Sequence, residues 1–251
     1  MSGWPQKFLS AFNARHPYDS ISAQESSLSI GDAYDIQHQF VSLRQEHIRG
    51  YKAALTALPA QQAMNIHLPI IGVLFDSGEF AIERRLQLTQ AALLETEIGF
   101  VTATSIRSPV TATEVFNLMS GCMAMIEIAS PNLNDRPNGL DLIATNAASY
   151  GYICSPLQSL EMASDDLPVT LTREGKIQLT GLSGEVLGGQ QDALAWLINQ
   201  VLLRGYTIEP GHLLMTGSIG GMCPAASGHY QADFGALGAL NFSVAAAPAS
   251  T

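Results

Sequence analysis

The chain has 251 residues, of which 47% are hydrophobic and 14% are charged, so it can form one large domain or one domain with a smaller appendage. Its net charge is −10 and no basic cluster is larger than the pair Arg84-Arg85, which excludes the electrostatic surface that nucleic acids and anionic membranes require. Three widely spaced cysteines, and no apolar run near the ~20 residues of a membrane span, predict a cytoplasmic protein with reduced thiols.

The first 65 residues carry helix signals. Ser29-Ile30-Gly31-Asp32 has the serine-to-acid spacing of a capping box at a helix start. Apolar residues at helical spacing follow it as far as about Arg49, namely Ala33, Ile36, Phe40 and Leu43. Residues 1–65 are therefore predicted to form a smaller helical N-terminal part.

The pattern changes at Ile66 to short apolar runs separated by glycine, proline, asparagine and aspartate. Such runs are typical of strands joined by turns, so residues 66–251 are predicted to form a β-rich catalytic domain and the whole chain an α+β protein. The other predicted elements are helices over Thr111–Met119 and Asp192–Val201, and a hairpin over Leu167–Leu179 that turns at Glu174-Gly175.

Three glutamates lie within apolar, strand-like runs. Glu95 and Glu97 are two residues apart and so share one face of a strand. A Glu-x-Glu pair is also common on the wet face of a half-exposed strand. Glu127, however, is the one charge in the run 122–129, and a carboxylate in such surroundings needs a positive partner. Three carboxylates with no nearby histidine or cysteine predict a site for Mg²⁺ or Mn²⁺.

Seven short motifs occur in order along nearly the whole chain. They are Asp32-Ala33-Tyr34-Asp35-Ile36-Gln37, Gly50-Tyr51-Lys52, Gly72-Val73-Leu74-Phe75-Asp76, Glu95-Thr96-Glu97-Ile98, Ile126-Glu127-Ile128, Asn146-Ala147 and Leu214-Met215-Thr216-Gly217-Ser218. Each motif alone is weak, but the seven in register are specific. Together they resemble the 2-keto-4-pentenoate hydratase and 4-oxalocrotonate decarboxylase branch of the fumarylacetoacetate hydrolase superfamily.

The resemblance implies a mixed β-roll core with a smaller helical N-terminal part, assembled into homo-oligomers. It also implies that Glu95, Glu97 and Glu127 hold a divalent metal, usually Mg²⁺, which chelates a 2-oxo acid through its carboxylate and keto oxygens. A metal on a keto oxygen stabilises the enolate that forms when a proton enters or leaves the conjugated chain.

Roles for five more residues follow from the resemblance. Lys52 is expected to support the substrate carboxylate or enolate and to be a candidate proton carrier, and Asp76 to act in acid–base work or in positioning water. The polar residues expected to line the substrate pocket are Asn146, Thr216 and Ser218. From the residues alone, a surface lysine at a helix end, a strand-end aspartate and ordinary loop residues remain alternatives.

His67 and His212 are the histidines that a hydrolytic relative would use to activate water. Neither has an acidic companion at a recognisable spacing, so packing or surface roles are preferred for both. Hydrolysis of a carbon–carbon bond would need an acid and histidine pair to activate water, and the sequence does not indicate such a pair.

The chain departs from the family pattern at several positions. Ala54 replaces a glycine, Thr145 replaces an aspartate, Gly211-His212 replaces Gly-Asp, and Ser130-Pro131-Asn132 replaces Asp-Ser-Arg. The missing arginine predicts a substrate whose distal end is uncharged. A family member that binds a second carboxylate at the distal end of its substrate would be expected to supply a cation there.

The predicted function is metal-dependent hydration of a 2-hydroxy-2,4-dienoate, in its keto form a 2-oxo-4-enoate, to a 4-hydroxy-2-oxo acid in aromatic catabolism. Decarboxylation of a 2-oxo-3-enedioate of the 4-oxalocrotonate type, and a non-catalytic family member, are the alternatives. The expected partner is a small 2-oxo acid, and a decarboxylase or aldolase of the same pathway is a candidate companion.

Overall fold

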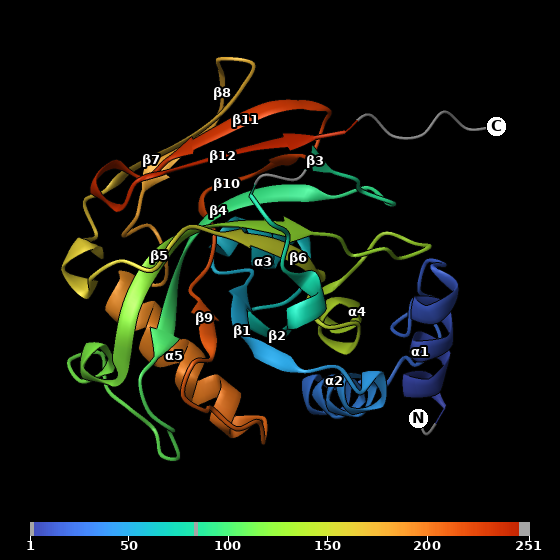
Figure 1. Ribbon diagram of the computed structural model, residues 1–251. Coiled ribbons are helices and arrows are strands. Elements are labelled where there is room, and N and C mark those ends of the chain that lie inside the picture. The colour runs from blue at the N-terminus through green and yellow to red at the C-terminus, as the bar shows by residue number, and fades with distance from the viewer. Residues whose placement is uncertain (1–2, 83–84, 246–251) are drawn as a thin grey trace.

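The computed structural model describes residues 3–82 and 85–245, and its centre is a curved mixed sheet (Figure 1). The order of this larger sheet is β2-β1-β9-β4-β5-β6, and β10 pairs with β4 beside that path. Its strands are β1 (Ile48–Ala54), β2 (Ile70–Phe75), β4 (Leu93–Thr102), β5 (Met119–Ala129), β6 (Ser149–Cys154), β9 (Leu213–Met215) and β10 (Ile219–Pro224).

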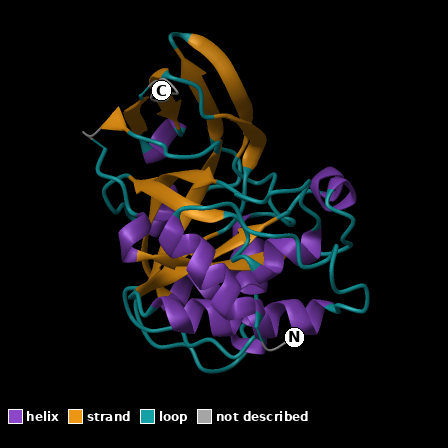
Figure 2. Ribbon diagram, turned by 90° about the vertical axis from the view of Figure 1, so that its right-hand side faces the viewer, coloured by secondary structure: helices purple, strands orange, loops and turns teal. Residues whose placement is uncertain are grey.

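A smaller sheet of order β3-β12-β11-β7-β8 lies above the larger one in Figure 1. Figure 2 shows most of the helices gathered at the other end of the molecule. The strands of the smaller sheet are β3 (Arg85–Leu86), β7 (Pro168–Arg173), β8 (Lys176–Leu182), β11 (Gly228–Asp233) and β12 (Ala239–Val244). The helices are α1 (Trp4–Ala14), α2 (Ile30–Arg44), α3 (Leu58–Ala63), α4 (Gly139–Ala144) and α5 (Gln190–Leu203), with short 3₁₀ turns η1 (Asp76–Gly78), η2 (Val115–Leu118), η3 (Leu160–Met162) and η4 (Gly235–Leu237).

The N-terminal part is helical except for one strand. Helix α2 begins with the predicted capping box between Ser29 and Asp32, but it ends at Arg44 because Gln45 adopts left-handed backbone angles with φ 53°. The chain then enters β1, which pairs with β2 on one side and with β9 on the other. This strand belongs to the larger sheet although it lies within residues 1–65, so the N-terminal part that was predicted to be helical also contributes one strand to that sheet.

Two of the other predicted elements form, and one does not. Strands β7 and β8 make the predicted hairpin, and the positive φ angles of Glu174 and Gly175 suit its tight turn. Helix α5 includes all of the predicted helix. The prediction of a helix over Thr111–Met119 was wrong. Within that range only the 3₁₀ turn η2 forms, and it ends at Leu118 because Met119 is extended and begins β5.

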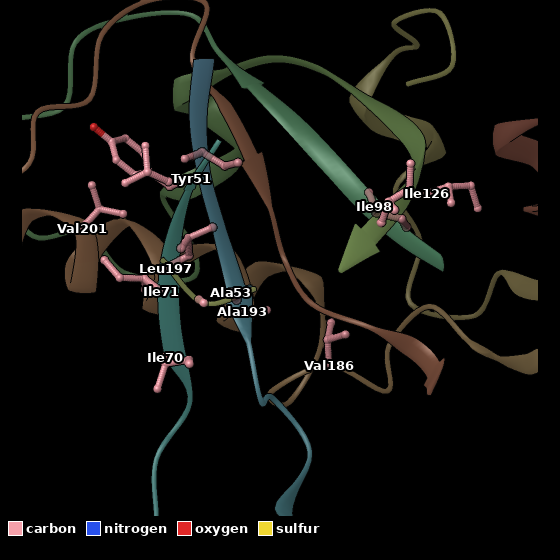
Figure 3. Close-up of a cluster of buried hydrophobic side chains, with 14 of the residues drawn as sticks. Tyr51, Ala53, Ile70, Ile71, Ile98, Ile126, Val186, Ala193, Leu197 and Val201 are labelled. Carbon is pink, nitrogen blue, oxygen red and sulfur yellow. The ribbon is translucent and has the colours of Figure 1, made fainter. Parts of the chain in front are cut away.

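The core beside β1 explains where that strand directs its side chains. In Figure 3, Tyr51 and Ala53 lie beside Ala193, Leu197 and Val201 of α5, and all five side chains belong to one buried cluster. Because neighbouring side chains of a strand point to opposite faces, the residue between Tyr51 and Ala53 points away from α5. That residue is Lys52.

Within the part of the chain that the structure describes, no helix combines the length and the apolar character that crossing a bilayer requires.

Candidate metal and substrate site

The three glutamates come together on the paired strands β4 and β5. Glu95 is directly opposite Glu127 in the antiparallel register, and Glu97 lies two residues further along β4 on the same face. One carboxylate oxygen from each of the three lies within 4.8 Å of one from each of the others. The alternation that the sequence showed therefore produces a single cluster of carboxylates.

Lys52 joins this cluster from β1. Its ammonium group donates to Glu127 Oε1, and both side chains are 2% exposed. Burial disfavours the charge of Lys52, but the nearby carboxylates of Glu127 and Glu95 outweigh it and raise the pKa of the lysine. Lys52 is therefore a buried cation, and the alternative of a surface lysine at a helix end was wrong.

One lysine does not neutralise three carboxylates. Burial first, and the charge of Glu127 second, raise the pKa of Glu95 to about 7 and hold that of Glu97 well above its ordinary range. Glu97 Oε2 accepts a hydrogen bond of 2.7 Å from Gly217 N–H, whereas Glu97 Oε1 is buried and has no hydrogen-bond partner. Such an oxygen needs a partner, and a hard divalent cation fits it and the other two carboxylates.

A cavity of about 170 Å³ opens beside the cluster. Lys52 and Glu95 are the charged residues in its described lining, and the hydroxyl-bearing ones are Thr56 and Ser218. Ser218 Oγ donates to Gly221 O at 2.6 Å. The apolar lining includes Ala54, Leu55, Ala57, Ala60, Met64, Ile70, Leu93, Ala129, Pro131, Pro137, Leu142, Ala147, Ala148 and Met222.

Asn146 and Thr216 lie next to the site, but their side chains form hydrogen bonds with other parts of the protein. The side-chain amide of Asn146 donates to Val73 O and accepts from Val73 N–H, so it braces β2. The Thr216 hydroxyl lies 2.7 Å from Gln190 Oε1 and 3.0 Å from Ile98 O. Neither side chain lines the cavity, although the neighbouring residues Ala147 and Ser218 do.

The structure does not bring Asp76 to the cavity. Asp76 follows β2 in the exposed turn η1, and its Oδ2 lies 2.7 Å from His47 Nδ1. His67 is exposed, and His212 packs against Tyr51 with its Nδ1 3.3 Å from Glu209 N. None of these three residues lines the cavity that touches the carboxylates.

Two features of the site had weak signals in the sequence. Gln190 is buried where α5 begins and links Ser183 O, through its Nε2, to the Thr216 hydroxyl. Helix α3 and its flanking residues supply one wall of the cavity, where Ala60 of the helix and Met64 directly after it carry no chemical motif. Gln190, Ala60 and Met64 become part of the site only because the fold brings distant segments of the chain together.

No family model matches the chain. A 2-hydroxyhexa-2,4-dienoate hydratase of Comamonas testosteroni is 27% identical over 234 residues, 89% of each chain. A 2-oxo-hept-4-ene-1,7-dioate hydratase of Escherichia coli is 26% identical over an alignment that covers 94% of each chain. A solved structure of 4-oxalocrotonate decarboxylase from Pseudomonas putida G7, complexed with magnesium and adipate, matches with a TM-score of 0.89 and 23% identity over 97% of this chain and 96% of that one.

The structural match confirms the predicted α+β class and the mixed β-roll core of the fumarylacetoacetate hydrolase type. The chain is thus similar in sequence to 2-hydroxydienoate and 2-keto-4-pentenoate hydratases and similar in fold to 4-oxalocrotonate decarboxylase, in agreement with the resemblance of its motifs.

Proposed function

We propose that the protein hydrates a 2-hydroxy-2,4-dienoate, the enol of a 2-oxo-4-enoate, to a 4-hydroxy-2-oxo acid with the help of a divalent metal. The observation that carries this proposal is the cluster of the buried Glu97 and Glu127 with the half-buried Glu95 and with Lys52, beside an apolar cavity. The hydratases among the relatives support the reaction class.

The three glutamates would hold Mg²⁺ or Mn²⁺, and the unpaired Glu97 Oε1 supports this assignment. A bound divalent cation would supply positive charge that stabilises the enolate of a 2-oxo acid. Lys52 keeps a second positive charge at the same place, because Glu127 holds its ammonium group. We propose that Lys52 orients the substrate head and stabilises its developing negative charge.

The reaction balances in two proton movements. The 2-hydroxyl loses its proton while carbon 5 gains one, which gives a conjugated 2-oxo-3-enoate. Water then adds its oxygen to carbon 4 and a proton goes to carbon 3. The apolar lining would exclude other water from these carbons, and Lys52 is the described titratable residue of the lining outside the glutamate cluster.

The other predicted residues take supporting roles in this proposal. Ser218 would contact the substrate from the cavity wall, whereas Asn146 and Thr216 would hold the wall in place. Asp76 is left out, since its carboxylate is exposed beside His47. Cytoplasmic location and homo-oligomeric assembly remain part of the proposal, and sedimentation of the purified protein would test the assembly.

The test is turnover of 2-hydroxypenta-2,4-dienoate, followed by loss of its ultraviolet absorbance with Mg²⁺ or Mn²⁺. We expect EDTA and Glu97→Gln to abolish turnover, and Glu161→Gln, a change at an exposed glutamate, to preserve it. Turnover that survives both EDTA and Glu97→Gln would contradict a metal-dependent reaction. No turnover by a folded, metal-loaded protein would contradict the hydratase proposal and favour the decarboxylase or the non-catalytic alternative.

A further inference from the structure

One wall of the cavity is a single face of helix α3 and its flanking residues. Ala57, Ala60 and Met64 all line the cavity, and their spacing of three and four residues places them on the same side of a helix. Gln61 steadies the turn before this helix, because its Nε2 donates to Leu55 O at 2.9 Å. The wall is therefore built from small or flexible apolar side chains on a braced element.

The charges of the described lining lie at the glutamate cluster and not at this wall. Lys52 is bonded to Glu127, and Glu95 is opposite Glu127 on the neighbouring strand. Arg136 precedes the lining residue Pro137, but Arg136 itself is exposed and does not line the cavity. A carboxylate held against α3 would therefore lose water without meeting a cation, which is costly.

We propose that α3 selects the substrate by its tail: the enzyme takes 2-oxo acids whose distal end is a hydrogen or a short alkyl group, and it rejects those that end in a second carboxylate. The inference rests on the proposed function, because it places the 2-oxo acid head at Glu95, Glu97 and Glu127. The tail then extends along Ala60 and Met64, where the contacts are apolar.

Binding separates this inference from catalysis. Calorimetry on the Mg²⁺-loaded protein would compare 2-oxohexanoate with 2-oxohexanedioate, which share a head and a chain length but end in a methyl group or a carboxylate. We expect the dioate to bind about 100-fold more weakly. Equal or tighter binding of the dioate would overturn the inference. If neither acid binds, the placement of the head at the metal site is wrong and the proposed function fails with it.

Substitutions at Met64 test the assigned wall. Met64→Lys preserves an unbranched side chain of similar length but adds a cation, whereas Met64→Gln is the neutral polar control. We expect Met64→Lys to bind 2-oxohexanedioate at least about tenfold more tightly than the unsubstituted protein, and Met64→Gln to keep the preference for 2-oxohexanoate. If Met64→Lys leaves the preference unchanged, the tail does not lie against α3.

Arg136→Ala completes the set, because Arg136 is the described cation nearest in sequence to the lining of the tail wall. We expect this change to leave the affinities for both acids unaltered. A selective loss of dioate binding in Arg136→Ala would show that the loop supplies a cation to the tail, and it would overturn the proposed preference. Turnover of 2-hydroxyhexa-2,4-dienoate and of 2-hydroxyhepta-2,4-diene-1,7-dioate should follow the same order as binding.

Discussion

The position of the Lys52 side chain is set by the packing of its two neighbours in the strand. Tyr51 and Ala53 are drawn into the core against α5, and the alternation of the strand then directs Lys52 into the carboxylate cluster. Lys52 and Glu127 form a buried ion pair, and removing either partner would leave the other with an uncompensated charge, which is destabilising.

Replacing Lys52 by methionine removes the charge and preserves most of the shape. We expect Lys52→Met to lower kcat/KM for the dienoate by at least about 100-fold, because the developing enolate loses a fixed positive charge. The assay needs saturating Mg²⁺ and a circular dichroism check of folding. Lys176→Met, at the exposed first residue of β8, is the matched control. A loss of less than about threefold would show that Lys52 serves the fold alone.

Sequence alone could place the three glutamates but not the roles of all their polar neighbours. The spacing of Glu95 and Glu97 fixes a shared face for any strand, and the apolar run around Glu127 indicates burial. Asn146 and Thr216 have no such internal signal. Their side chains bind Val73 and Gln190, which lie 73 and 26 residues away, so their direction depends on contacts that local sequence does not encode.

At the scale of the elements, the connection from β9 to β10 sets the position of Glu97. Gly217 adopts φ +121°, and this conformation allows its N–H to donate to Glu97 Oε2. A Cβ at this position would lie 2.5 Å from Thr56 Cγ2. Gln190 holds the preceding residue, Thr216, from α5. The candidate metal site is therefore braced from α5, a helix that carries none of the three glutamates.

Gly217→Ala is expected to displace this N–H from Glu97, both by the clash with Thr56 and by its unfavourable backbone angles. We expect Mg²⁺ affinity, measured by calorimetry, to fall by about tenfold, in line with the loss of a group that orients a metal ligand. Gly238→Ala is the control, because Gly238 also has positive φ but a Cβ there would meet nothing within 4 Å. Equal Mg²⁺ affinity in both variants would contradict the bracing role.

Strand β1 illustrates why some elements could not be predicted. Its residues Ile48–Ala54 include Arg49 and Lys52 and resemble the end of the preceding helix. They become a strand because β2 and β9 supply hydrogen bonds from residues 70–75 and 213–215. By contrast, the capping box at Ser29 and the turn at Glu174-Gly175 are complete within four residues, and both were predicted correctly.

For the whole molecule, metal binding and folding should be linked, because the carboxylate cluster is stable only when its charge is balanced. At a Mg²⁺ concentration 100 times the dissociation constant, the free energy of unfolding should rise by about 2.7 kcal/mol. Thermal denaturation with and without Mg²⁺ measures this gain. Glu97→Gln should remove most of it, and an undiminished gain in that variant would locate the binding of Mg²⁺ elsewhere.

The pH dependence of the metal-free protein follows from the raised pKa of Glu95. Its pKa is 4.5 ordinarily and about 7 in the fold, so its contribution to stability is present below pH 4.5 and is lost as the pH rises through 7. The melting temperature of the metal-free protein should therefore fall relative to Glu95→Gln between about pH 5 and pH 8. Saturating Mg²⁺ should remove this fall. Parallel curves for the two metal-free proteins would contradict the raised pKa of Glu95.

Strand β9 has three residues and lies between β1 and β4 in the larger sheet, more than 150 residues after β1 in the chain. During synthesis on the ribosome, β1 and β2 can pair early, and β4 to β6 can pair soon after. The larger sheet cannot become continuous between β1 and β4 until residues 213–215 have emerged, and the Gly217 N–H that binds Glu97 follows them. We therefore expect the hydrogen bond that positions Glu97 to form late in the synthesis of each chain, because it depends on long-range closure of the sheet.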